Sequence, residues 1–85
     1  MFRKAKLRVK VDAGMFGSER TVSFVAGQRV YNLLVDAVDV TDNQLEVGVI
    51  AESAKEKRAL IQLPRDTFSS GSRIFVPSAL LEPAL

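Results

Sequence analysis

Strict alternation of apolar and polar residues over residues 5–12, AKLRVKVD, is the clearest strand signal in the sequence. Residues 19–26, ERTVSFVA, predict a second strand with Val22 and Phe24 turned inward. The loop between them, residues 13–18, carries glycine on both sides of two large apolar residues. We therefore expect the two strands to pair as an antiparallel hairpin.

Residues 29–40, RVYNLLVDAVDV, fit two patterns. Read as a helix, their apolar side chains form one stripe and their polar side chains the opposite face. Read as a strand, alternate residues from Tyr31 onward share a face, and a bulge must bring Val38 and Val40 inward. We favour the strand because valine occurs four times, and its branched side chain loses χ1 freedom in helices. In addition, no Ser, Thr, Asp or Asn precedes Arg29 to cap a helix.

The rest of the chain predicts short strands separated by turns. Residues 38–49 indicate a hairpin about Asp42 and Asn43, because both residue types accept the positive φ of a tight turn. This register would place Val38 opposite Val47. Further strands are expected at residues 59–63, which Pro64 and a turn through Asp66 would end, and at residues 73–76.

Six short apolar segments with turns at fairly regular spacing predict that residues 1–85 form one mainly β domain. The expected architecture is a small antiparallel barrel of five to six strands. If a helix forms at about residues 28–38, the order of elements instead matches a ubiquitin-like β-grasp, an α+β fold. Residues 29–40 therefore decide between the two folds.

The segment Val76–Glu82, VPSALLE, resembles the end of Src-homology-three domains. In that family a strand is followed by Pro-Ser, a 3₁₀ turn and a short closing strand. The resemblance implies the family's small barrel architecture. It implies no binding residues, because the sequence contains no tryptophan and Tyr31 is its only tyrosine.

Composition excludes several kinds of chemistry. The chain has no cysteine and no histidine, which removes disulfides, thiolate metal sites, imidazole ligands and the usual general base. We expect a protein that is not an enzyme and that holds no metal or other cofactor. No apolar run approaches the ~20 residues of a membrane-spanning helix, and the basic start lacks the apolar region of a signal peptide. We therefore expect a cytoplasmic protein with no membrane contact.

Charge is concentrated at the N-terminus, where residues 1–10 contain five basic side chains and no acid. In an extended segment Lys4, Lys6, Arg8 and Lys10 would project from one face about 6.6 Å apart. That spacing is comparable to successive phosphates along a nucleic-acid strand. The alternative is a solvated outer face whose lysines protect an edge strand from aggregation.

Two loops carry further candidates. Met15 and Phe16 lie at a glycine-flanked tip, where large apolar side chains can anchor a partner protein. The alternative is that Phe16 folds back onto the barrel end, and its solvent exposure distinguishes the two. The second candidate is an anion-binding nest that combines free backbone N–H groups with an arginine, formed by Ser70, Gly71, Ser72 and Arg73. An ordinary connection into the last strand is its alternative.

These observations predict a non-enzymatic binding module that contacts a partner protein or a second copy of itself. The alternative is sequence-independent nucleic-acid binding through the basic N-terminal strand. The sequence does not identify the partner.

Overall fold

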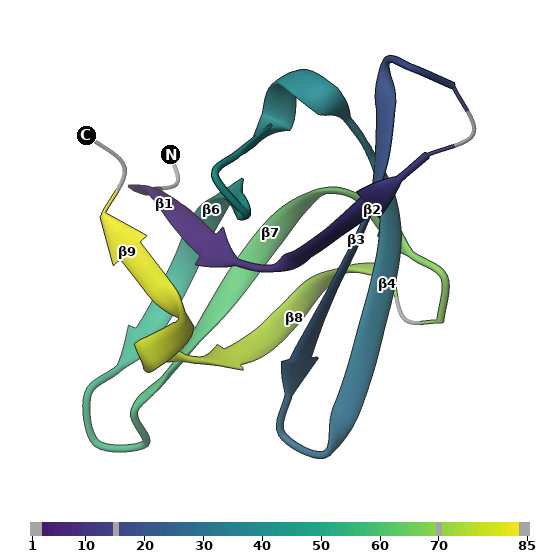
Figure 1. The fold of residues 1–85 in the computed structure, drawn as a ribbon. Helices are drawn as coiled ribbons and strands as arrows, with labels where there is room; N and C mark the ends of the chain where they lie inside the picture. The colour runs from purple at the N-terminus through teal and green to yellow at the C-terminus, as the bar shows by residue number, and fades with distance from the viewer. Residues whose placement is uncertain (1–2, 15, 70, 84–85) are drawn as a thin grey trace.

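The computed structural model describes residues 3–14, 16–69 and 71–83, and they form a mainly β protein (Figure 1). In these residues nine strands and two 3₁₀ turns follow one another: β1 (Arg3–Arg8), β2 (Lys10–Ala13), β3 (Glu19–Ala26), β4 (Arg29–Asp36), η1 (Ala37–Asp39), β5 (Val40–Thr41), β6 (Gln44–Ser53), β7 (Arg58–Thr67), β8 (Gly71–Pro77), η2 (Ser78–Leu80) and β9 (Leu81–Pro83). None of the described segments is a helix long and apolar enough to cross a membrane.

The strands form two antiparallel sheets. The larger has the order β8-β7-β6-β1-β9, with the short β5 also pairing with β6, and the smaller has the order β2-β3-β4. The predicted mainly β, antiparallel character is confirmed. Among the described residues, however, strand pairing does not close the sheets into a barrel.

The predicted first strand is divided between the two sheets by a bend at Val9 (Figure 1). Before the bend, β1 pairs with β6 and β9. After it, β2 pairs with β3, as the hairpin prediction required. The Val9 N–H donates a 2.9 Å hydrogen bond to the carbonyl of Asn43. The predicted hairpin is therefore confirmed for β2 and β3, whereas the residues of β1 pair in the other sheet. The alternation gives the whole segment a single apolar face, and the bend lets that face line the core beneath both sheets.

Residues 29–36 form strand β4, so the helix considered at about residues 28–38 and the β-grasp fold are wrong. All eight residues of β4 pair with β3. Leu33 and Val35 are buried, whereas Leu34 between them is only partly covered. Pairing with a neighbouring strand satisfies the backbone groups that a helix would satisfy internally, and it buries one face of a period-two pattern.

The turn η1 ends this segment and removes Val38 from the core. Val38 is 88% exposed, and Val47 lies opposite Ala5 of β1. The predicted pairing of Val38 with Val47 is therefore wrong, because only Val40 and Thr41 pair with β6 and the turn η1 holds Val38 outside the sheet. The predicted turn is confirmed, since Asp42 and Asn43 have φ values of 53° and 61°.

Strand β7 continues through Pro64 to Thr67, so the prediction that Pro64 ends the strand and starts a turn is wrong. Between Gln62 and Thr67 the register with β8 is irregular and no ladder pairs form. Proline lacks the N–H that a ladder needs, and an irregular stretch tolerates that loss. Strand β7 instead contacts β4 of the smaller sheet. Directly after β7, the Phe68 N–H donates a 2.8 Å hydrogen bond to the Asn32 carbonyl of β4.

Candidate functional site

Three of the predicted cations lie on the outer face of β1, but acidic side chains from neighbouring strands accompany them. Lys4 forms a 3.5 Å ion pair with Glu46 of β6, and Arg8 forms a 3.7 Å ion pair with Glu82 of β9. Lys6 stands opposite both acids in the strand register. This face therefore carries alternating charge.

Lys10 is separated from the other three cations. It lies beyond the bend, on β2 of the smaller sheet, opposite Ser23. Among the residues that the structure describes, it takes part in no ion pair. The four cations therefore do not form the single straight row that the sequence suggested.

Phe16 is exposed, at 67% of its surface, and does not fold back onto the core. The Glu19 N–H donates to the Phe16 carbonyl at 3.0 Å, and the Gly14 N–H donates to the Glu19 carbonyl at 3.2 Å. Arg20 also donates to the carbonyl of Gly17 at 2.9 Å. The loop thus holds an exposed aromatic ring on a braced turn. Met15, the other predicted anchor, lies outside the described residues.

Two residues of the predicted anion nest, Ser72 and Arg73, contact Gln62 of β7. Ser72 Oγ accepts a 2.8 Å hydrogen bond from Gln62 Nε2, and Arg73 Nε donates to Gln62 Oε1 at 2.8 Å. Gly71 has the positive φ of a tight turn, 74°. Ser70 lies outside the described residues. The side chains of Ser72 and Arg73 are therefore engaged on the sheet surface.

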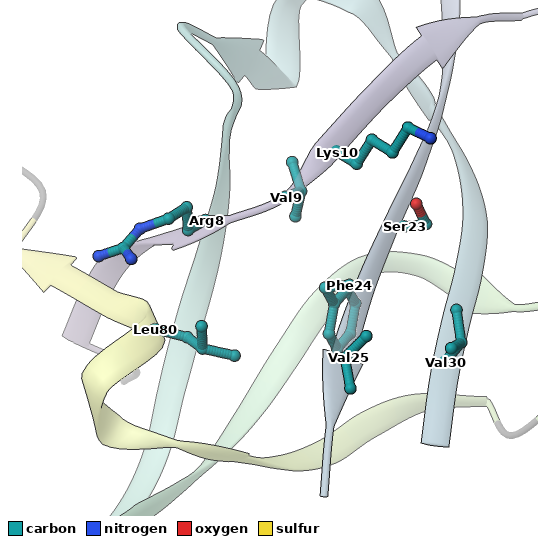
Figure 2. A pocket seen from close by; sticks show the side chains of 8 residues that line it. All are labelled: Arg8, Val9, Lys10, Ser23, Phe24, Val25, Val30 and Leu80. Carbon is teal, nitrogen blue, oxygen red and sulfur yellow. The ribbon is translucent and has the colours of Figure 1, made fainter. Parts of the chain in front are cut away.

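An apolar groove lies where the two sheets meet at the bend (Figure 2). Five apolar side chains line it, from β3, β4, η2 and the bend itself: Val9, Phe24, Val25, Val30 and Leu80. Figure 2 shows Leu80 on one side, Val30 on the other, and Phe24 with Val25 between them. The volume is about 310 Å³. We call these five residues the groove.

The hairpin of β3 and β4 creates one wall of the groove. Val25 and Val30 lie opposite each other in the register, and each is 57% exposed. Below them, Phe24 is buried and stacks on Tyr31 with ring centroids 5.4 Å apart. Gly27, with φ of 66°, allows the tight turn that joins the strands. The wall therefore has an ordered aromatic base and an apolar rim open to solvent.

Positive charge borders the groove. The side chains of Arg8 and Lys10 flank it, and none of its described lining residues is acidic. The Glu82 carboxylate lies beside Arg8 at 3.7 Å, whereas the ammonium of Lys10 has no such neighbour among the described residues. The arrangement suits a ligand that combines an apolar side chain with a carboxylate.

Sequence reasoning named Arg8 and Lys10 but missed the groove between them. One signal was available. Val25 occupies a position on the polar face of its strand, after Thr21 and Ser23, and Val30 faces it across the turn. Two valines at facing positions on an otherwise polar surface indicate an exposed apolar pair.

The described residues contain no cluster of three or more carboxylates that would hold a metal ion. Comparison of the chain with known protein families, curated proteins and solved structures finds no match in any of the three. The functional argument therefore rests on the geometry of this chain.

Proposed function

We propose that this protein is a non-enzymatic binding module that holds an apolar, acid-flanked segment of a partner protein in the groove. The observation that supports it is the exposed pair Val25 and Val30 beside Lys10, which forms no ion pair with any residue that the structure describes. Burying apolar surface contributes about 25 cal/mol of favourable free energy for each Å² removed from water. An exposed apolar pair with an ordered base is therefore a favourable place for a partner side chain.

The size of the groove limits what fits. Ligand pockets usually have volumes of about 300–1,000 Å³, and this groove is at the lower end at about 310 Å³. It accommodates one or two large side chains. The cations Arg8 and Lys10 then attract carboxylates next to those side chains, which increases the association rate and selects against basic segments.

A protein partner is favoured over nucleic acid, the alternative prediction. Binding a phosphate backbone along β1 would require Lys4 and Arg8 to leave Glu46 and Glu82. The same acids would remain close to the bound phosphates and repel them. Phosphate contacts provide most of the affinity in sequence-independent binding, so this surface is poorly suited to it.

The barrel architecture expected from the sequence is also a proposal. Two features that link the sheets support it. The chain continues from β1 in one sheet through the bend into β2 in the other. In addition, β4 contacts β7, where Arg65 pairs with Asp36 at 3.2 Å. In a small barrel of this kind the groove would lie at the corner where the first strand changes sheets.

Binding of a fluorescein-labelled peptide, EDLFDE, tests the proposed function by fluorescence anisotropy. Val30→Glu places a negative charge in the groove and should weaken binding at least about tenfold, or about 1.4 kcal/mol. Val38→Glu is the matched control, because it makes the same change at an exposed valine of η1 outside the groove. It should leave peptide affinity unchanged.

Two further ligands complete this experiment. The peptide KKLFKK should bind much more weakly than EDLFDE, because Arg8 and Lys10 repel it. A single-stranded oligonucleotide should bind weakly and should not compete with EDLFDE. Equal affinity of the Val30→Glu and Val38→Glu variants for EDLFDE would contradict the proposal.

A further inference from the structure

We propose that the partner is a second copy of this chain, whose exposed Phe16 enters the groove. This inference rests on the proposed function and specifies its ligand. Phe16 and Val38, which we call the tip, supply the apolar side chains. The groove of the next copy receives them, so the copies join head to tail.

The tip is a prominent apolar feature held in place by backbone contacts. Phe16 is 67% exposed and Val38 is 88% exposed. Their two loops meet where the Ala37 N–H donates a 2.7 Å hydrogen bond to the Ser18 carbonyl. Since the loops are joined and braced, little conformational entropy is lost when the tip docks.

The charges around the tip and the groove are complementary. Asp12 in β2 precedes the loop of Phe16, Asp39 in η1 directly follows Val38, and neither forms an ion pair within the described part of the chain. One carboxylate oxygen of Glu19, at the start of β3, is buried. Arg20, the neighbouring cation, is engaged with the Gly17 and Glu19 carbonyls. The groove is instead flanked by Arg8 and Lys10. A tip with acidic residues next to it in sequence thus meets a groove flanked by cations, as the proposed function requires of a ligand.

The loop before β3 and the turn between β3 and β4 lie at opposite ends of the smaller sheet (Figure 1). Val25 and Val30 of the groove lie beside that turn. Strand β3 begins at Glu19, beside the tip loop, and ends at Ala26, beside the groove. Its eight residues extend about 23 Å at ~3.3 Å per residue. A tip therefore cannot fill the groove of its own copy. Contacts between different surfaces are heterologous, so they build rings or open chains.

The expected association is weak and depends on salt. A contact of a few side chains is smaller than a standard stable interface, which implies a dissociation constant of about 0.1–1 mM. Sedimentation velocity from about 0.02 to 2 mM protein should show the average mass rising with concentration. Added salt should reduce this rise, because screening weakens attraction between exposed charges.

Mixing two variants provides the decisive test. Phe16→Ser removes the aromatic side chain of the tip and keeps the groove, whereas Val30→Glu places a charge in the groove and keeps the tip. Both positions are exposed, so both variants should fold. Each alone should stay monomeric over the whole concentration range. An equimolar mixture should form a dimer and nothing larger, because only one tip and one groove remain functional in each pair.

Three outcomes would overturn the inference: a wild-type protein that stays monomeric at about 2 mM, a Phe16→Ser variant that associates like the wild type, or a mixture that remains monomeric. EDLFDE binding by the Phe16→Ser variant separates this inference from the proposed function. If the variant binds the peptide while the wild type stays monomeric, only the self-association is wrong. If neither protein binds the peptide, the groove itself is not a binding site.

Discussion

Replacing Leu33 with alanine is expected to cost about 2–5 kcal/mol of unfolding free energy, because the side chain is fully buried and its loss leaves a cavity. A domain of this length has a total stability of roughly 4–13 kcal/mol. The change should therefore leave the protein marginally folded or partly unfolded at 25 °C. Urea denaturation followed by circular dichroism measures the loss as a lower midpoint at a similar slope.

Leu34→Ala is the control, since Leu34 is the next residue and is only partly covered on the outer face of β4. It should lower the free energy of unfolding by less than half as much as Leu33→Ala does. In a helix both leucines would lie on the apolar stripe, and both substitutions would be severe. Equal losses at the two positions would therefore contradict the strand.

Gly14→Ala is expected to cost about 1–3 kcal/mol, the usual range for a group forced into a filled space. A Cβ at Gly14 would lie 2.6 Å from the backbone carbon of Glu19 and 2.7 Å from its oxygen. The backbone must move to relieve this clash, and the bond from the Gly14 N–H to the Glu19 carbonyl would break. Because that bond braces the loop of Phe16, self-association should weaken as well.

Gly17→Ala, in the same loop, should instead increase the stability of the protein. Nothing lies within 4 Å of a Cβ at Gly17, and alanine restricts the unfolded chain, which typically stabilises a protein by about 0.4–1 kcal/mol. Thermal unfolding of both variants checks the pair. A Gly14→Ala protein as stable as Gly17→Ala would show that the loop does not pack against Glu19 as described.

Local patterns predicted the strands and much of the core. The alternation around Val22 and Phe24 correctly identified the inward positions of β3. Asp42 and Asn43 identified a turn because few other residue types accept a positive φ. Each of these predictions needed only neighbouring residues.

Strand pairing was less predictable because it depends on residues far apart in sequence. The alternation over residues 5–12 shows one apolar face but does not show that β1 pairs with β6 and β2 with β3. Pro64 is accommodated in β7 because the ladder with β8 is irregular there, which local sequence does not reveal.

The groove could not be predicted without knowing how the strands pair and pack. Leu80 joins Val30 in the groove although 50 residues separate them, and the bend at Val9 brings their elements together. The charged residues on the groove's border were visible in the sequence as part of a basic segment. That Arg8 on β1 pairs with Glu82, whereas Lys10 on β2 forms no ion pair among the described residues, depends on the bend between the two strands.

Chemical-shift mapping tests most directly the central claim that the groove is the binding surface. Titrating ¹⁵N-labelled protein with EDLFDE should shift the amide resonances of Val9, Val25, Val30 and Leu80 together along one saturating curve. The resonances of Lys4, Lys6 and Glu46 on the outer face of the larger sheet should stay in place. Shifts confined to that outer face, or no saturable shifts at the groove, would contradict the account.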